Sequence, residues 1–247
     1  MSIAPDAWLS TTLTRPVFAV HLPADAEREA AVQAIAEHAA RHVGAFYFAK
    51  LSPLDLTGVS ALSRAGFQMV EASLGLGRSL GDAPLDGETN GGVAVDAFDG
   101  RWRDEVLDVA GSCFRYSRFH VDPRFERSLA DHVKREWIRS YVERRRGDCL
   151  LVAHDRGEAL GFAAMLVAPR TGGPAAVIDL IGVRPGDQQR GVGQALVRAA
   201  MARYAPRCTA IEVGTQAANV PSVRLYERNG FRLIRSGLVL HLHAGKS

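Results

Sequence analysis

The chain has 247 residues, of which 47% are hydrophobic and 23% are charged, and its formal net charge is +3. This length suffices for one large domain or two modest ones, and the composition excludes a disordered chain. The charge is too small to indicate nucleic acid as a partner. The cysteines, Cys113, Cys149 and Cys208, form no close pair in the sequence. We therefore expect no disulfide framework, no cysteine zinc site, and a reducing, cytoplasmic location.

We expect no membrane partner. The longest apolar stretch runs roughly from 159 to 169, about half of the ~18 residues that a membrane-spanning helix needs. The first ten residues lack the basic start and apolar block of a secretory signal.

The N-terminal part alternates between strand-like and helix-like segments. The patterns predict strands at 16–21, 45–50 and 67–76, and helices at 27–42 and 56–64. This alternation indicates a small α/β domain over residues 1–76. The glycine- and aspartate-rich stretch 77–92 is typical of a linker.

The remaining residues, 93–247, predict a second and larger α/β unit. Its expected helices are 101–115, 124–146, 191–204 and 220–228. Its expected strands are 93–98, 149–154, 159–167, 177–183, 208–213 and 231–241. Residues 149–154 and 159–167 are expected to form a hairpin across 155–157, so this pair of strands should be antiparallel.

One internal echo links the two units. Residues 62–76 and 226–240 match at five positions with one constant offset, including Gly66 with Gly230 and Phe67 with Phe231. Both copies predict a helix that ends at a glycine and a strand that begins with a buried phenylalanine. Chance similarity stays open. If the echo is real, the first unit is a degenerate copy, and its Leu62 in place of Tyr226 puts the chemistry in the second unit.

The strongest chemical signal is a glycine-containing turn between the strand 177–183 and the helix 191–204. It reads Gln188-x-x-Gly191-x-Gly193. The first turn of a helix has unpaired N–H donors and a positive dipole end, a combination that binds a diphosphate. The spacing is neither GxxxxGK[ST] nor GxGxxG. From the turn alone, a helix start without a ligand stays open.

Together with Asn219 and the segment 225–231 (LYERNGF), this turn resembles the GNAT N-acetyltransferase family over about residues 93–243. The resemblance implies the α/β GNAT acyl-CoA N-acyltransferase fold with a mixed central sheet, preceded by a smaller partial GNAT-like α/β domain. It implies acetyl-CoA as cosubstrate and no metal. The cofactor-binding residues that it implies are Ile181, Gly182, Val183, Gln188, Gln189, Arg190, Gly191, Val192, Gly193, Gln194, Asn219 and Tyr226.

Two residues are candidates for catalysis. The resemblance implies that Tyr226 donates a proton to the leaving thiolate, and a phenol with a pKa near 10 suits this role. Asp179 is a carboxylate in an otherwise apolar strand, four residues before Val183, so alternation puts both side chains on one face. Asp179 could act as the base, directly or through water. It could equally bond a neighbouring backbone group or hold a cation of the substrate. We expect His241 and His243 to be solvated residues at a sheet edge, and not a metal pair.

The segment 113–125 joins the first two helices of the second unit, where this fold has its acceptor pocket. The candidate substrate-binding residues are Arg115, Tyr116, Ser117, Arg118, Phe119 and His120. Arginine suits phosphate, and an aromatic ring can stack on a base or a sugar. A merely solvated loop stays open.

A narrower resemblance concerns 117–120, 122–125 and Trp137, which look like the bacterial TDP-fucosamine acetyltransferase subgroup. It implies acetyl transfer to a nucleotide-linked 4-amino-4,6-dideoxy sugar. Other acceptors stay open, namely a peptide N-terminus, a polyamine or an antibiotic. So does an acetyl-CoA-binding sensor without turnover. A homodimer paired through the last strands is a further option. Residues 1–90 either complete the pocket or shield a sheet edge.

Overall fold

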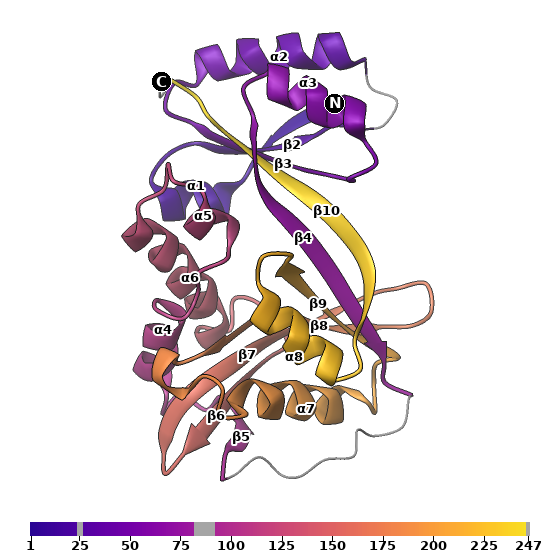
Figure 1. Ribbon diagram of the computed structural model, residues 1–247. Helices are drawn as coiled ribbons and strands as arrows, with labels where there is room; N and C mark the ends of the chain where they lie inside the picture. Colours follow the sequence, from indigo (N-terminus) through magenta and orange to yellow (C-terminus); the bar gives the residue numbers. More distant parts are fainter. Residues whose placement is uncertain (24–26, 82–91, 246–247) are drawn as a thin grey trace.

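The computed structural model describes residues 1–23, 27–81 and 92–245. Within these residues one ten-stranded sheet has the order β1-β2-β3-β10-β4-β9-β8-β7-β6-β5. It is mixed, because β2–β3 and β8–β9 pair in parallel and the other neighbours pair antiparallel. Helices cover both faces (Figure 1). The expected α/β class with a mixed sheet is confirmed.

The strands are β1 (Ser2–Pro5), β2 (Val17–His21), β3 (Phe46–Leu51), β4 (Gln68–Ser79), β5 (Ala94–Ala97), β6 (Cys149–Asp155), β7 (Glu158–Ala168), β8 (Ala175–Val183), β9 (Ala210–Gln216) and β10 (Arg232–His243). The helices are α1 (Ala7–Leu13), α2 (Arg28–Arg41), α3 (Leu56–Arg64), α4 (Arg103–Ala110), α5 (Arg118–Val121), α6 (Arg127–Val142), α7 (Val192–Tyr204) and α8 (Val220–Arg228).

The order of elements expected from residue 16 onward is confirmed, apart from the added helix α5 and a longer β4. The N-terminal elements before residue 16, β1 and α1, were also not predicted. The Asp6 side chain caps α1 by accepting a 2.9 Å hydrogen bond from the Leu9 amide, and Leu9 is buried. Helix α5 lies in the stretch expected as a loop. β4 extends to Ser79, into the expected linker, while residues 82–91 of that linker lie outside the described residues.

The internal echo is visible in the local structure. Gly66 follows α3 with φ +90° and Gly230 follows α8 with φ +76°, and the phenylalanine after each glycine is buried. β4 and β10 are both 12 residues long and pair with each other. Leu233 lies opposite Leu76 at one end, and Leu240 opposite Met69 at the other.

Each of these two strands also pairs with a strand from the other part of the chain. β10, the last strand of the chain, lies between β3 and β4, and β4 lies between β10 and β9. Both strands run side by side from the region of α2 and α3 to the region of α7 and α8 (Figure 1). One continuous sheet therefore joins residues 1–81 to residues 92–245.

The position of β10 corrects the expectation for its two histidines. His241 is fully buried and His243 is 5% exposed, because the rings of Phe46 and Phe125 pack against both of them. Asp122 Oδ2 accepts hydrogen bonds from His241 Nδ1 (2.8 Å) and His243 Nε2 (3.1 Å), and Arg124 donates to both of its oxygens. The three residues form a buried polar cluster that ties β10 to the segment after α5.

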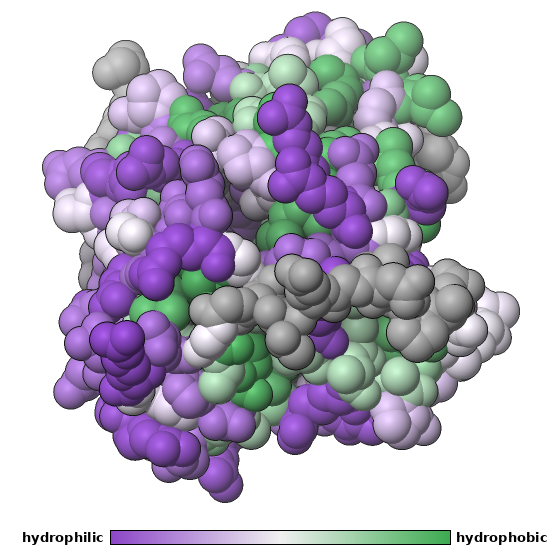
Figure 2. Space-filling view, turned by 60° about the horizontal axis from the view of Figure 1, so that its bottom comes forward, coloured by the Kyte–Doolittle hydropathy of each residue, from purple (hydrophilic) through white to green (hydrophobic). Residues whose placement is uncertain are grey.

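The core lies on both faces of the sheet. On one face α7 contributes Leu196 and Val197 to a cluster with Ile178, and on the other α4 and α6 contribute Leu107 and Ile138. Figure 2 shows a face on which hydrophilic residues predominate and hydrophobic ones gather in smaller areas between them. Among the described residues, no helix combines the length and the apolar character that crossing a membrane requires.

Candidate functional site

A cleft opens where two parallel strands part. The pairing of β8 with β9 ends at Ile178 opposite Val213. Beyond this point β8 stays paired with β7 as far as Val183, and β9 stays paired with β4 as far as Gln216. The resulting gap belongs to a cleft of about 690 Å³, which residues between 113 and 229 line. No described residue of 1–81 lines it, and β4 instead covers the edge of β9.

Backbone groups of β8 face this gap. The Arg184 amide donates a 2.8 Å hydrogen bond to the Leu160 carbonyl at the start of β7. Because peptide groups alternate in direction along a strand, the amides of Ile181 and Val183 point the other way, towards the gap. The gap therefore offers a ladder of backbone groups to an extended ligand.

The turn before α7 forms one end of the cleft. Gly191 is the N-cap of α7 with φ +81°, in the left-handed region that favours glycine, and no side chain caps the helix. The first amides of α7 are therefore left for an anion. A Cβ at Gly193 would lie 3.2 Å from the Leu225 side chain, so α8 packs close beside this turn.

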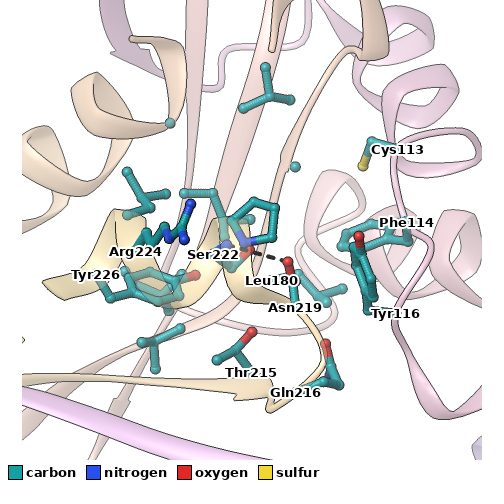
Figure 3. Close-up of a pocket in the computed structure, with 18 of the residues that line it drawn as sticks. Cys113, Phe114, Tyr116, Leu180, Thr215, Gln216, Asn219, Ser222, Arg224 and Tyr226 are labelled. Carbon is teal, nitrogen blue, oxygen red and sulfur yellow. Dashed lines mark hydrogen bonds between the residues drawn. The ribbon is translucent and has the colours of Figure 1, made fainter. Parts of the chain in front are cut away.

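Helix α8 supplies the two predicted residues next to the gap. The Asn219 side chain accepts a 3.3 Å hydrogen bond from the Ser222 amide and so caps α8. Tyr226 is 2% exposed, yet it lines the cleft, and burial raises the pKa of its hydroxyl. No hydrogen bond links this hydroxyl to another residue that the structure describes. Figure 3 shows both residues across the cleft from Phe114 and Tyr116.

Asp179 lines the cleft, but its carboxylate is already bonded. Oδ2 accepts hydrogen bonds from Trp137 Nε1 (2.8 Å), Tyr141 OH (2.7 Å) and Arg146 Nε (2.9 Å). The expectation that Asp179 and Val183 share one face is wrong. Ala164 pairs with Leu180 and Met165 with Ile178, so Asp179 is the extra residue of a β-bulge. The bulge turns Asp179 towards α6, while Val183 packs in the cluster on the α7 face.

The opposite wall comes from the segment after α4 and from α6. Arg115, Tyr116 and Ser117 line the cleft as expected, together with Cys113, Phe114 and Lys134. Burial raises the pKa of the Cys113 thiol to about 12, which fits packing better than nucleophilic attack. A Cβ at Gly182 would lie 2.6 Å from Cys113 Sγ, so this wall sits directly on β8.

The other three candidates on this segment do not line the cleft, because α5 turns Arg118 and Phe119 towards the N-terminal strands and His120 towards α6. The Arg118 guanidinium lies 4.1 Å from the centre of the Phe48 ring, and burial lowers its pKa to about 10. Phe119 is 2% exposed in a core cluster. His120 bonds Ser117 Oγ (2.6 Å) and Asp131 (3.0 Å).

The strand end and the turn before α7 agree with their prediction more closely than the acceptor segment does. Eight predicted cofactor-binding residues of the strand and turn line the cleft: Ile181, Gly182, Val183, Gln188, Gln189, Gly191, Gly193 and Gln194. Two others do not. The Val192 side chain packs in the core, and Arg190 is ion-paired with Asp187. Both remain next to the turn through their backbone.

Sequence reasoning missed Lys134 and the end of β9. Lys134 lies four residues after Ala130 and three before Trp137, which is the spacing of one helix face. A lysine within this largely apolar stripe was the available signal. No local sequence pattern indicated that Val213–Gln216 line the cleft, because this depends on where β9 stops pairing with β8.

Comparison with known proteins agrees with this geometry. The model of the Acetyltransferase (GNAT) family matches residues 103–231, which is more than half of the chain. The tandem GNAT protein from the clavulanic acid biosynthesis pathway has a similar structure, with a TM-score of 0.62 and 14% identity. That similarity covers 94% of this chain and 77% of the other, and it extends the fold agreement over both units.

Two curated relatives match part of the chain. The spore coat polysaccharide biosynthesis protein SpsD of Bacillus subtilis (strain 168) is 27% identical over 144 residues, 58% of this chain and 48% of the relative. The mycothiol acetyltransferase of Propionibacterium freudenreichii subsp. shermanii is 28% identical over 155 residues, 62% of this chain and 47% of the relative. The matches span about half the length of each relative.

Proposed function

We propose that this chain, which belongs to the acetyltransferase (GNAT) family, transfers an acetyl group from acetyl-CoA to the amine of a small molecule. The observation that carries the proposal is the gap between β8 and β9, which leads directly to the uncapped start of α7. An extended thioester with a diphosphate needs both parts in this order.

The residues of the cleft fit acetyl-CoA. The first amides of α7, beginning after Gly191, would hold the pyrophosphate. The backbone of Ile181 and Val183 would pair with the extended arm, and Asn219 lies beside that arm on α8. Gly193 lies so close to Leu225 that a larger side chain at this turn would require the Leu225 side chain to shift.

Acetyl-CoA, when bound, supplies an activated acetyl group and a thiolate leaving group. The Ile181 amide, which points into the gap, is placed to polarise the acetyl carbonyl. Tyr226 would donate its hydroxyl proton to the thiolate sulfur. The pKa of the Tyr226 hydroxyl lies above its ordinary value near 10, so the hydroxyl carries the proton near neutral pH that an acid requires.

Asp179 is better suited to positioning than to accepting a proton. Three donors, from Trp137, Tyr141 and Arg146, occupy its Oδ2 atom. We therefore assign it the task of holding α6 against β8, and we assign removal of the amine proton to water in the cleft.

For the acceptor we propose a nucleotide-linked amino sugar. Arg115 and Lys134 line the wall of the cleft opposite Tyr226, and Asp179, the carboxylate among the described lining residues, is already bonded. This balance favours an anionic acceptor over a polyamine. The polysaccharide role named for the Bacillus relative supports a sugar. The three free cysteines support a cytoplasmic location.

The test is thiol release from acetyl-CoA in the presence of different amines, with nucleotide-linked 4-amino sugars beside polyamines, peptides and aminoglycosides. We expect a clear preference for a nucleotide sugar. Acetyl-CoA binding is measured separately by calorimetry. Binding without release for any amine would favour a sensor, and absence of binding would overturn the proposal as a whole.

A further inference from the structure

Lys134 is a buried cation that faces the cleft from α6. The residue is 8% exposed and lines the cleft. Its Nζ lies 5.1 Å from the centre of the Phe114 ring and 5.2 Å from that of Trp137. Aromatic faces attract a cation, but they supply no hydrogen-bond acceptor with the strength of a carboxylate.

The ammonium group of Lys134 has no hydrogen bond or ion pair with any residue that the structure describes. The nearby carboxylates are both engaged. Asp179 accepts from Trp137, Tyr141 and Arg146. Glu71 on β4 interacts with Lys50 and Arg118 as well as with Lys134, so cations outnumber it.

Because Lys134 lines the cleft, a ligand there can supply the hydrogen-bond acceptor that the described protein residues do not. Arg115 stands on the same wall of the cleft and adds a second cation on the acceptor side. The two residues come from different elements, α6 and the segment after α4, and both line the cleft together with Phe114 and Tyr116, which Figure 3 labels.

We propose that Lys134 selects the acceptor by binding an acidic group on it, a phosphate or a carboxylate, while the amine points towards β8. This inference rests on the proposed function and names the feature of the substrate that the cleft requires. Lys134 is thus a specificity-determining residue, and Tyr226 on the opposite wall remains the acid.

The charge state of Lys134 gives the proposal a second readout. Burial lowers its pKa to about 8, with Arg118 adding to the decrease and Glu71, Asp179 and Cys113 opposing it. A bound anion stabilises the charged form, so anion affinity should fall as the pH rises above about 8. If Lys134 instead acted as a neutral base, it would contribute nothing to anion affinity.

The experiment uses the full chain saturated with CoA, so that the donor half of the cleft is occupied. Thymidine diphosphate and succinate are titrated in separately by calorimetry, the first as a phosphate probe and the second as a carboxylate probe. We expect one of them to bind, with affinity at least about tenfold lower in Lys134→Met and largely retained in Lys134→Arg.

Arg135→Met is the matched control. Arg135 is the next residue of α6 and pairs with Asp108 outside the cleft, so this variant should keep the anion affinity. The wild type should lose affinity above about pH 8, and Lys134→Met should show no such loss.

Equal anion binding by Lys134→Met and the wild type would overturn the proposal, and so would absence of binding by both probes to the CoA-loaded protein. CoA binding itself is measured for every variant. If CoA fails to bind to the wild type, the proposed function fails. If CoA binds and the anion results are negative, only the role of Lys134 fails.

Discussion

The Tyr141 hydroxyl donates a 2.7 Å hydrogen bond to Oδ2 of Asp179, across the boundary between helix α6 and strand β8. This contact fixes the wall of the cleft that carries Lys134 to the strand that would carry the acetyl group. The carboxylate thus belongs to the framework of the site.

Asp179→Asn should therefore act mainly on stability and on acceptor KM. Loss of the charged partner of Arg146 should lower the free energy of unfolding by about 2 kcal/mol. The pH profile of kcat should keep its shape, because no base is removed. Glu212→Gln is the control, since Glu212 is a strand carboxylate bonded to Arg170 and Arg235 away from the cleft lining. If the acid limb of the Asp179→Asn profile disappeared, Asp179 would be the base after all.

Tyr226→Phe should lower kcat by about 10²-fold or more, because it removes the general acid but little apolar surface. The Kd for acetyl-CoA should be nearly unchanged in calorimetry. Tyr204→Phe offers a comparison, as Tyr204 is equally buried but bonds Asp148 outside the cleft. It should lose stability and keep turnover. Full activity of Tyr226→Phe would remove Tyr226 from the mechanism.

Gly191→Glu should abolish acetyl-CoA binding, since a carboxylate at the start of α7 would repel the pyrophosphate. The positive φ of Gly191 also makes any side chain there strained by roughly 1 kcal/mol, so Gly191→Ala is needed beside it. We expect Gly191→Ala to fold and to bind acetyl-CoA more weakly. Gly186→Glu puts the same charge on the preceding turn, in open space, and should bind normally. Unchanged affinity of Gly191→Glu would contradict the phosphate site.

Acid should destabilise the fold through the cluster of Asp122, His241 and His243. Burial lowers the pKa of His241 to about 4, although the hydrogen bond to Asp122 opposes the decrease. The neutral native histidine therefore contributes stability that is present above pH 6.5 and is lost as the pH falls towards about 4. This amounts to on the order of 3 kcal/mol.

Urea unfolding of the wild type and of His241→Asn across this pH range tests the effect. Asparagine can keep the donor to Asp122 but does not titrate, so its curve should be flatter. Parallel curves would exclude His241 as the source of the pH dependence.

The sequence patterns predicted those parts of the site that are built from neighbouring residues. The turn at Gly191 and the helix carrying Tyr226 depend on local spacing, and both line the cleft. Features that depend on contacts between distant segments could not be predicted from the sequence. The bulge at Asp179 reflects the register of β7 against β8, and it reversed the face that alternation assigns. Similarly, His241 is buried because Phe46 and Phe125, which come from distant segments, pack against its ring.

The same dependence on distant segments explains why the positions of residues 113–125 were predicted only in part. Its residue types predicted a polar wall, and Arg115 and Tyr116 line the cleft. Helix α5 then directs Phe119 into a core that contains the nearby Phe125 and also Phe46, which is distant in the sequence. Packing against the N-terminal strands decided these orientations, and no local pattern carries that information.

The exchange of β4 and β10 has a consequence for assembly. Neither half of the chain can complete its sheet alone, because β3 requires β10 and β9 requires β4. Separately expressed fragments 1–81 and 92–247 should therefore find each other and restore the ten-stranded sheet. By the same logic, a chain with a shortened connection between β4 and β5 would satisfy its pairing with a second copy, giving a strand-swapped dimer with two clefts.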